Sequence, residues 1–166
     1  MKNTEITHRL SFRAVTAEDE GVINEFFDAM GGESRALFNR RDYNRNGVLK
    51  YCRRPDPTRR YWLAELDGRM AGYVFFLSFD TSIPELGLAL CDDLQGQHLG
   101  RELVAFAQNE AHACGKGGIL LTTHVANVRA QALYEAMGFV CMGTCKNGTE
   151  LFYLYRYRER EGFHIV

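Results

Sequence analysis

The chain has 166 residues, 46% of them hydrophobic and 25% charged, with a formal net charge of -1. This length and composition suit one domain with a large core, and the near-neutral charge argues against a general attraction to nucleic acid. The five cysteines form no C-x-x-C pair, the first residues are polar and no apolar run approaches the roughly 20 residues that span a bilayer, so we expect a cytoplasmic protein with reduced thiols and no membrane contact.

The first third of the chain predicts one strand followed by helices. Residues 10–15 alternate like a half-buried strand, and Thr16 precedes acidic residues that favour the first turn of a helix. Apolar residues at helical spacing follow, and Gly31 would end that helix. A second short helix is expected at 34–38. From 39 to 60 the periodicity fades, and we expect a long loop or a helix with a loop.

The middle of the chain predicts three strands and a long helix. Residues 61–66 and 70–77 are rich in β-formers and flank an Asp-Gly turn at 67–68, so they should pair as antiparallel strands. A third strand at 85–91 leads through a glycine-bearing turn into an amphipathic helix at 99–114. Such a strand, turn and helix expose free N–H groups and the positive end of a helix dipole, which together suit a diphosphate.

The last part of the chain predicts a strand, a helix and a final hairpin. Residues 118–125 form an apolar run typical of a buried strand, and Asn127 would cap a helix that ends at Gly138. Strands near 139–142 and 151–155 are joined by a turn with an Asn-Gly pair. This order of elements, without repeats or linkers, predicts one α/β domain on a mixed sheet.

Three motifs follow one another in an informative order. Glu85 is an acidic residue on the strand before the turn, Gln95 begins a Gln-x-x-Gly-x-Gly-like loop, and Asn127 begins the segment Asn-x-Arg-Ala-x-x-Leu-Tyr-x-x-x-Gly-Phe. With these motifs the chain resembles the GNAT superfamily of acyl-CoA-dependent N-acyltransferases over residues 10–155. The resemblance implies a single domain over residues 1–166 and an α/β fold, α+β by some schemes. Its sheet would be mixed and mostly antiparallel, with about seven strands flanked by about four helices and with strands 4 and 5 splayed apart.

The resemblance also implies that acetyl-CoA is the acyl donor, and it assigns the cofactor a set of contacts. The main chain at Leu88, Ala89 and Leu90 would contact pantetheine. Backbone N–H groups of the loop would hold the diphosphate, and the side chains of Asn127 and Arg129 would contact the cofactor as well. The loop residues are Gln95, Gly96, Gln97, His98, Leu99, Gly100 and Arg101. Capping alone would also explain Asn127, and a solvated position would explain the arginines.

His98 departs from the family pattern, which usually has glycine in the middle of the loop. A side chain at this position implies a negative φ, with the imidazole directed either away from the phosphates or onto them. An ordinary surface residue at the start of a helix is the alternative to a phosphate contact.

Acetyl transfer to an amine requires one group that takes a proton from the amine and another that protonates the departing thiolate. An amine like that of lysine, with a pKa of about 10.4, is mostly protonated near neutrality. The resemblance implies Glu85 as the base, commonly acting through a water, and Tyr134 as the general acid. The alternatives are a solvent-facing or arginine-paired carboxylate and a tyrosine packed in the core. His124 is either a second base or, more simply, a hydrogen-bonded structural residue.

The stretch from Arg35 to Arg60 is basic, because nine Lys or Arg residues against Asp42 and Asp56 give a local net charge of +7. In the resembling family the segment after the first helix lines the acceptor side of the cleft. The excess therefore suggests an acceptor that carries a carboxylate or phosphate. A solvated basic loop is the alternative.

We therefore expect an N-acetyltransferase that moves an acetyl group from acetyl-CoA to a primary amine of a small molecule or peptide, by direct attack in a ternary complex. The alternative, suggested by His98, is a non-catalytic regulatory module that binds acyl-CoA. No metal site and no nucleic-acid or membrane partner are expected. A homodimer through the final strand or through the tail at 156–160 is left open.

Overall fold

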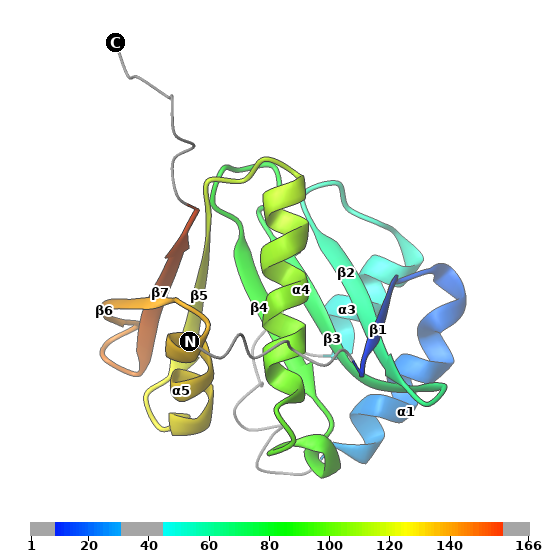
Figure 1. Ribbon diagram of the computed structural model, residues 1–166. Helices are drawn as coiled ribbons and strands as arrows, with labels where there is room; N and C mark the ends of the chain where they lie inside the picture. Colours follow the sequence, from blue (N-terminus) through cyan, green and yellow to red (C-terminus); the bar gives the residue numbers. More distant parts are fainter. Residues whose placement is uncertain (1–8, 31–44, 158–166) are drawn as a thin grey trace.

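Seven strands form one open sheet in the order β1-β2-β3-β4-β5-β7-β6 (Figure 1). In this computed structural model the described residues are 9–30 and 45–157, so the short helix expected at 34–38 lies outside them. Neighbouring strands are antiparallel except β4 and β5, which are parallel, and this confirms the predicted mixed sheet. The strands are β1 (Ser11–Ala14), β2 (Arg60–Leu66), β3 (Arg69–Leu77), β4 (Glu85–Leu90), β5 (Gly118–His124), β6 (Val140–Cys145) and β7 (Glu150–Arg156).

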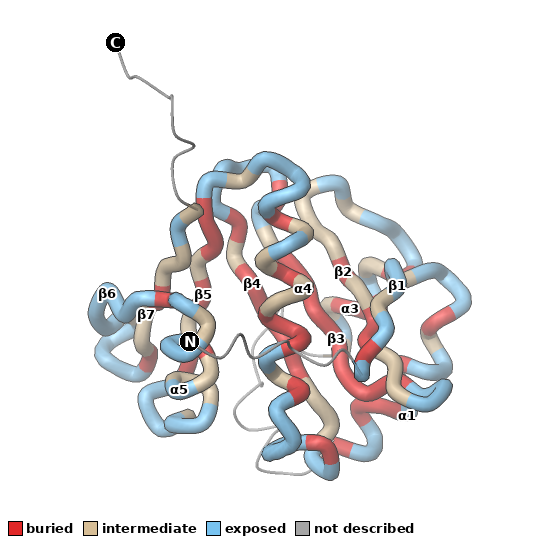
Figure 2. Tube along the Cα trace, viewed as in Figure 1, coloured by how far each residue is buried: buried red, intermediate tan, exposed pale blue. Residues whose placement is uncertain are grey.

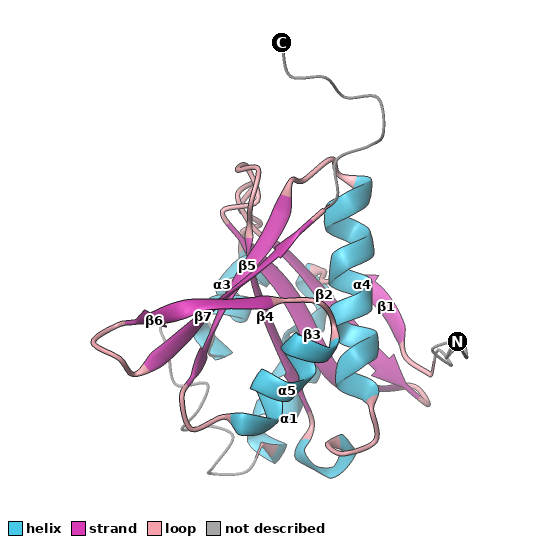
Figure 3. Ribbon diagram, turned by 60° about the vertical axis from the view of Figure 1, so that its left-hand side comes forward, coloured by secondary structure: helices cyan, strands magenta, loops and turns pink. Residues whose placement is uncertain are grey.

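Helices cover both faces of the sheet (Figure 3). Helix α4 and Tyr134 of α5 pack on one face, whereas α1 and α3 build the core on the other. Among the described residues, no helix combines the length and the hydrophobicity needed to cross a bilayer. The helices are α1 (Glu20–Ala29), α3 (Arg45–Arg53), α4 (Leu99–Ala113) and α5 (Val128–Ala136), together with the short 3-10 helices η1 (Ala17–Asp19) and η2 (Asp92–Leu94).

Helix α3 lies in the stretch where the sequence predicted either a long loop or a helix with a loop, and the structure has the helix. Its apolar side is buried against α1. Two ion pairs hold the same helices together, Arg45 with Asp28 at 2.5 Å and Arg53 with Glu20. Because these two arginines neutralise acidic residues of α1, less of the local basic excess remains for an acceptor.

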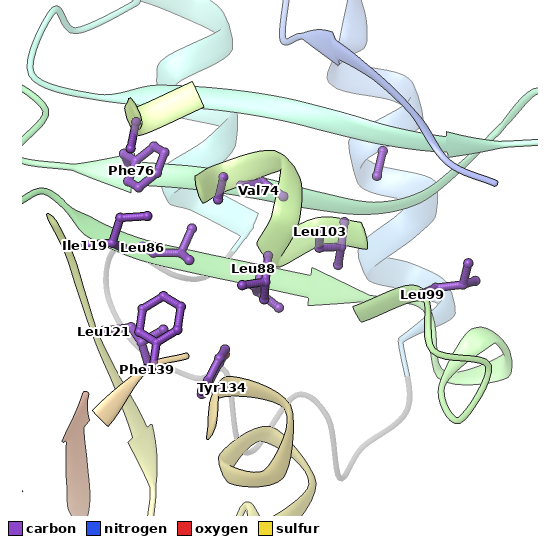
Figure 4. Packing of buried hydrophobic residues seen from close by; sticks show 14 of the residues in the cluster. Val74, Phe76, Leu86, Leu88, Leu99, Leu103, Ile119, Leu121, Tyr134 and Phe139 are labelled. Atoms are coloured by element: carbon purple, nitrogen blue, oxygen red, sulfur yellow. The ribbon is translucent and has the colours of Figure 1, made fainter. Parts of the chain in front are cut away.

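Residues of β4 alternate between the two cores. Leu86 and Leu88 pack beneath α4 with Leu103 and Leu121 (Figure 4), whereas Ala89 belongs to the core beneath α1 and α3. In Figure 2 the buried residues run along β3 and β4 and along the inner side of α4. The odd-numbered residues of β4 therefore face the side of α1 and α3, and this set includes Glu85 at the start of the strand.

Strands β4 and β5 separate along their length, as expected for the fourth and fifth strands. They share one register position, Glu85 with Leu120, beside a hydrogen bond of 3.1 Å from the Leu120 N–H to the Pro84 carbonyl. Further along, β5 still pairs with β7 as far as His124, but no longer with β4. Figure 1 shows the two strands diverging toward the N-terminal end of α4. We call residues 86–90 and 121–124, which face each other without pairing, the fork.

Gly87 of β4 lies under the ring of Phe75 of β3. A Cβ placed on Gly87 would be 2.0 Å from Cζ of Phe75. Phe75 is fully buried, and its ring stacks on that of Tyr61. Because neither ring has room to move, we expect Gly87→Ala to lower the free energy of unfolding by about 1–3 kcal/mol, as other overpacked cores do. Urea unfolding measures this change.

Gly21→Ala in α1 is the matched control for that substitution. A Cβ at Gly21 would meet no atom within 4 Å, and alanine in a helix is favoured over glycine by about 0.5–1 kcal/mol. This variant should be as stable as the wild type or more stable. If Gly87→Ala unfolded at the same urea concentration as Gly21→Ala, the overpacking argument would fail.

The final strand is not an edge of the sheet, so of the two dimer routes that the sequence left open, edge-to-edge pairing through this strand is excluded. Strand β7 pairs with β5 on one side and with β6 on the other, so its N–H and C=O groups are already used and cannot form a dimer contact. The edge strand at this end of the sheet is β6, whose Val140 and Met142 are 60% and 59% exposed. The tail beyond residue 157 lies outside the described residues.

Candidate active site

Glu85 is located where the fork opens. It is the first residue of β4, it is half-buried, and it is in register with Leu120 of β5. Its side chain projects from the same face as Gly87, on the side of α1 and α3. The candidate base is thus next to the point at which β4 and β5 separate, on one defined face of the sheet.

Main-chain groups of β4 line one side of the fork. The Cys91 N–H donates to the Ala71 carbonyl of β3 at 2.8 Å. Because alternate residues of a strand direct their N–H and C=O groups to opposite neighbours, those of Leu88 and Leu90 are directed into the fork. The groups of Ala89 are directed to β3 instead, and its side chain is buried under α1 and α3. The structure therefore brings Leu88 and Leu90, but not Ala89, to the expected path of pantetheine.

His98 has a backbone conformation opposite to the one expected. Its φ is 60° and its ψ is 12°, which is the left-handed region, so the predicted negative φ is wrong. Gly96 also has a positive φ, of 83°. The chain turns sharply from η2 into α4 here, and a left-handed residue directly before Leu99 makes that turn. Glycine would adopt this conformation freely, whereas a residue with a Cβ does so at a cost of about 1–2 kcal/mol.

The glycine loop is tied to the beginning of α5 and to the end of β4. The Arg129 guanidinium donates to the Gln95 side-chain oxygen at 3.1 Å, and the Gln95 amide lies 3.5 Å from the Leu90 carbonyl. A Cβ on Gly100 would be 3.0 Å from Cδ2 of Leu133, so the small residue also allows α4 to approach α5. Residues from three distant segments of the sequence therefore meet at the wide end of the fork.

The remaining loop residues have different surroundings. Leu99 is 1% exposed and belongs to the core, so it offers a ligand no more than its main chain. The Gln97 amide donates to the Asp93 carbonyl at 3.4 Å. The Arg101 N–H donates to the His98 carbonyl at 3.2 Å, while its side chain is exposed. Of these three, Arg101 is the residue whose side chain can reach an anion in solvent.

Asn127 caps α5, because its Oδ1 accepts the Ala130 N–H at 3.2 Å. We expect Asn127→Ala to lower the free energy of unfolding by about 1 kcal/mol, and Asn127→Asp to keep most of the stability, since aspartate caps equally well. Thermal unfolding measures both. Equal losses in the two variants would contradict the capping role. If the Asp variant keeps its stability but binds coenzyme A more weakly in calorimetry, the amide also contacts the cofactor.

Tyr134 is buried at the junction of α5 with the sheet and is 8% exposed. Its ring lies 5.9 Å from that of Phe139 and 6.0 Å from that of Tyr153, and Figure 4 shows it beside Phe139 and Leu121. Burial raises the pKa of its hydroxyl, so the phenol stays protonated near neutral pH. Within residues 9–30 and 45–157 this hydroxyl has no hydrogen-bond partner. It is therefore a proton donor that the described protein does not use.

Glu85 and Tyr134 flank the fork from opposite faces of the sheet. Glu85 is on the face of α1 and α3, whereas Tyr134 belongs to the core cluster beneath α4, together with Leu88 and Leu121. A group held in the fork would have a carboxylate on one side and a phenol on the other. This arrangement can take a proton from one reactant and give a hydrogen bond to another.

His124 ends β5 and has the hydrogen-bonded structural role expected as its simpler alternative. Its Nδ1 accepts the Ala126 N–H at 3.0 Å, so that nitrogen carries no proton. Thr122, two residues earlier, was not predicted as a site residue, because a threonine in a strand is an ordinary β-former. Among the described residues, no group of three or more His, Cys, Asp or Glu could hold a metal ion.

Comparisons with known proteins agree with this fold. Residues 23–139 match the family model described as "Acetyltransferase (GNAT) family". The chain is similar to the solved ribosomal-protein-S5-alanine acetyltransferase from Vibrio fischeri, with 16% identity, a TM-score of 0.76, and 91% of this chain and 94% of that chain covered. The chain is also similar to the N-acetyltransferase from Thermoplasma acidophilum in complex with coenzyme A, with 18% identity, a TM-score of 0.73, and 90% of this chain and 100% of that chain covered.

A third similar structure is the dodecameric spermidine N-acetyltransferase from Vibrio cholerae, with 20% identity, a TM-score of 0.69, and 89% of this chain and 94% of that chain covered. At these identities the structural likeness shows a shared fold. A comparison with curated protein sequences gives no match.

Proposed function

Because the chain belongs to the acetyltransferase (GNAT) family, we propose that it transfers an acetyl group from acetyl-CoA to a primary amine of a small molecule or peptide, by direct attack within a ternary complex. The observation that carries the proposal is the fork, which opens beside Glu85, is flanked by Tyr134 and leads to the N-terminal end of α4. The fork thus has a proton acceptor on one side, a proton donor on the other and an anion site at its wide end.

Coenzyme A would extend along the fork. Its diphosphate would lie against residues 95–101, where the N–H groups at the start of α4 and the helix dipole favour an anion. The amides of pantetheine would pair with the main chain of Leu88 and Leu90, much as a short added strand would. The thioester would then reach the narrow end of the fork, near Glu85.

Each reacting group has a defined task in this arrangement. Glu85 takes a proton from the ammonium form of the acceptor, directly or through a water, and the neutral nitrogen attacks the thioester carbonyl. The new C–N bond forms, the C–S bond breaks, and the negative charge moves to sulfur. The nitrogen then loses its second proton, which neutralises the thiolate directly or through water, so that the products are the amide and the free thiol. A phenol is a weaker acid than a thiol, whose pKa is about 8.5. Tyr134 therefore acts chiefly as a hydrogen-bond donor to the sulfur as its charge develops.

The acceptor itself is proposed only as a class. The basic stretch favours an amine that carries a carboxylate or phosphate, but Arg45 and Arg53 already pair with acidic residues of α1. The neighbouring structures are named for acceptors as different as spermidine and a ribosomal protein. A panel of acceptors must therefore include polyamines, amino acids, phosphorylated amines and peptides.

The proposal is tested by mixing the purified protein with acetyl-CoA and each amine while the released thiol is followed. At least one amine should release coenzyme A well above the rate of hydrolysis, and mass spectrometry should show that the amine gains one acetyl group. If coenzyme A binds in calorimetry but no amine is acetylated, the non-catalytic binding module replaces this proposal. In that case Glu85→Gln would leave every measured property of the protein unchanged.

A further inference from the structure

Thr122 carries a buried hydroxyl whose hydrogen-bonding capacity is unused. Its Oγ1 is buried, and no partner for it exists in the part of the chain that the structure describes. The residue in register with it on β7 is the apolar Phe152. A buried hydroxyl without a partner costs free energy, and native structures contain few of them. Because Thr122 lies in the fork where substrates are proposed to bind, a bound ligand would supply the missing hydrogen-bond partner.

Thr122 is on the same face of the sheet as Glu85. Leu120 is in register with Glu85, and residues two apart on a strand share a face. Ile119 and Leu121, on the alternate positions of β5, belong to the core on the opposite face. The strand spacings place the Cα atoms of Glu85 and Thr122 about 8 Å apart.

We propose that the Thr122 hydroxyl positions the acceptor amine for Glu85, an inference that rests on the proposed function. Oγ1 accepts one N–H of the amine, and Glu85 takes the proton from another. Two hydrogen bonds of about 2.9 Å to one nitrogen place the two oxygens about 5 Å apart. Side chains that extend toward each other from Cα atoms about 8 Å apart can meet this requirement.

The place where β4 and β5 separate is consistent with this role for Thr122. If the two strands stayed in parallel register, β4 would cover the edge of β5 at Thr122. Because pairing ends at Glu85 and Leu120, the Thr122 position is left for a substrate. The hydroxyl holds the amine after Glu85 has taken the proton, so the nitrogen can turn its lone pair toward the thioester. Thr122 itself is chemically unchanged.

Three variants test this inference. Thr122→Val removes the hydroxyl and keeps the shape, Thr122→Ser keeps the hydroxyl, and Thr144→Val removes a hydroxyl from an exposed position of β6, outside the fork. For Thr122→Val we expect the KM of the amine to rise about tenfold or more, as for a lost hydrogen bond to a charged group. The KM of acetyl-CoA should not change. Thr122→Ser should restore the KM of the amine, and Thr144→Val should leave it unchanged.

Thermal unfolding of the free protein separates this role from a structural one. If the hydroxyl has no partner until the amine binds, Thr122→Val should be as stable as the wild type or more stable. An unchanged KM for the amine in Thr122→Val, a loss of stability in that variant, or no rescue by serine would each overturn the inference. If the wild type acetylates no amine, the proposed function fails first, and unfolding still decides whether the hydroxyl is unused.

Discussion

Glu85→Gln should lower kcat/KM for the amine by about a hundredfold to ten-thousandfold near neutral pH, the range found for general bases. Glutamine keeps the size and the polarity of the side chain but cannot accept the proton. The affinity for acetyl-CoA should not change, because the proposed cofactor contacts lie further along the fork. Steady-state kinetics for the amine, together with calorimetry for coenzyme A, separate the two effects.

The pH dependence of this loss gives a sharper test. For an amine with a pKa of about 10.4, the deprotonated fraction rises about tenfold with each unit by which the pH increases, until the pH approaches that value. The deficit of Glu85→Gln should therefore shrink steadily as the pH rises, since the substrate then needs no base. A deficit that stayed constant from pH 7 to pH 10 would mean that Glu85 acts in another way.

Asp93→Asn is the matched control for Glu85→Gln. Asp93 follows β4, and its carboxylate is 2.7 Å from Arg69 in an exposed ion pair. Exposed pairs contribute little to stability, and this carboxylate is remote from the narrow end of the fork. The control should keep the kinetics of the wild type for both substrates.

Tyr134→Phe should lower kcat by about tenfold to a hundredfold while the KM values change little, because in the proposed mechanism the hydroxyl acts on the sulfur only when the C–S bond breaks. The folded protein should lose no stability, since the hydroxyl has no hydrogen-bond partner within the described ranges. The pKa of Tyr134 is raised by burial. Its proton therefore remains in place through the alkaline range, and ionisation of Tyr134 should cause no fall in kcat below pH 9.

Tyr153→Phe is a matched control with the opposite pattern. Tyr153 belongs to the same core cluster, but its hydroxyl donates to the Glu135 carboxylate at 3.1 Å. Its removal should cost about 1 kcal/mol of stability and leave kcat unchanged. Tyr153→Phe should lose stability and keep its kcat. If Tyr134→Phe behaved in the same way, Tyr134 would be a structural core residue without a role in catalysis.

Much of the fold was predictable because it depends on local chemistry. The Asp-Gly pair at 67–68 joins β2 and β3, with a φ of 51° for Asp67 and 79° for Gly68. Asn127 caps α5, and Gly138 follows its end with a φ of 90°. In each case a side chain or its absence determines the backbone of its own neighbourhood. The order of strands and helices follows from such signals and from hydrophobic periodicity.

The candidate site was predictable only in part. The resemblance selected Glu85 and Tyr134, and the structure places them on opposite sides of one fork. The sequence did not reveal the left-handed φ of His98, because that angle depends on the direction in which α4 leaves the loop. It also did not reveal that the main chain of Ala89 is directed away from the fork, since this follows from which neighbour β4 pairs with.

By itself, the sequence determined the family, most of the described strands and helices, and the candidate groups for acetyl transfer. Only the tertiary structure decided that Thr122 shares a face with Glu85, that β7 lies inside the sheet, and that Gly87 must be small to admit Phe75. The physical reason is the same in all three cases. Local propensities act between residues a few positions apart, whereas strand register and the contacts across it join residues that are distant in the chain.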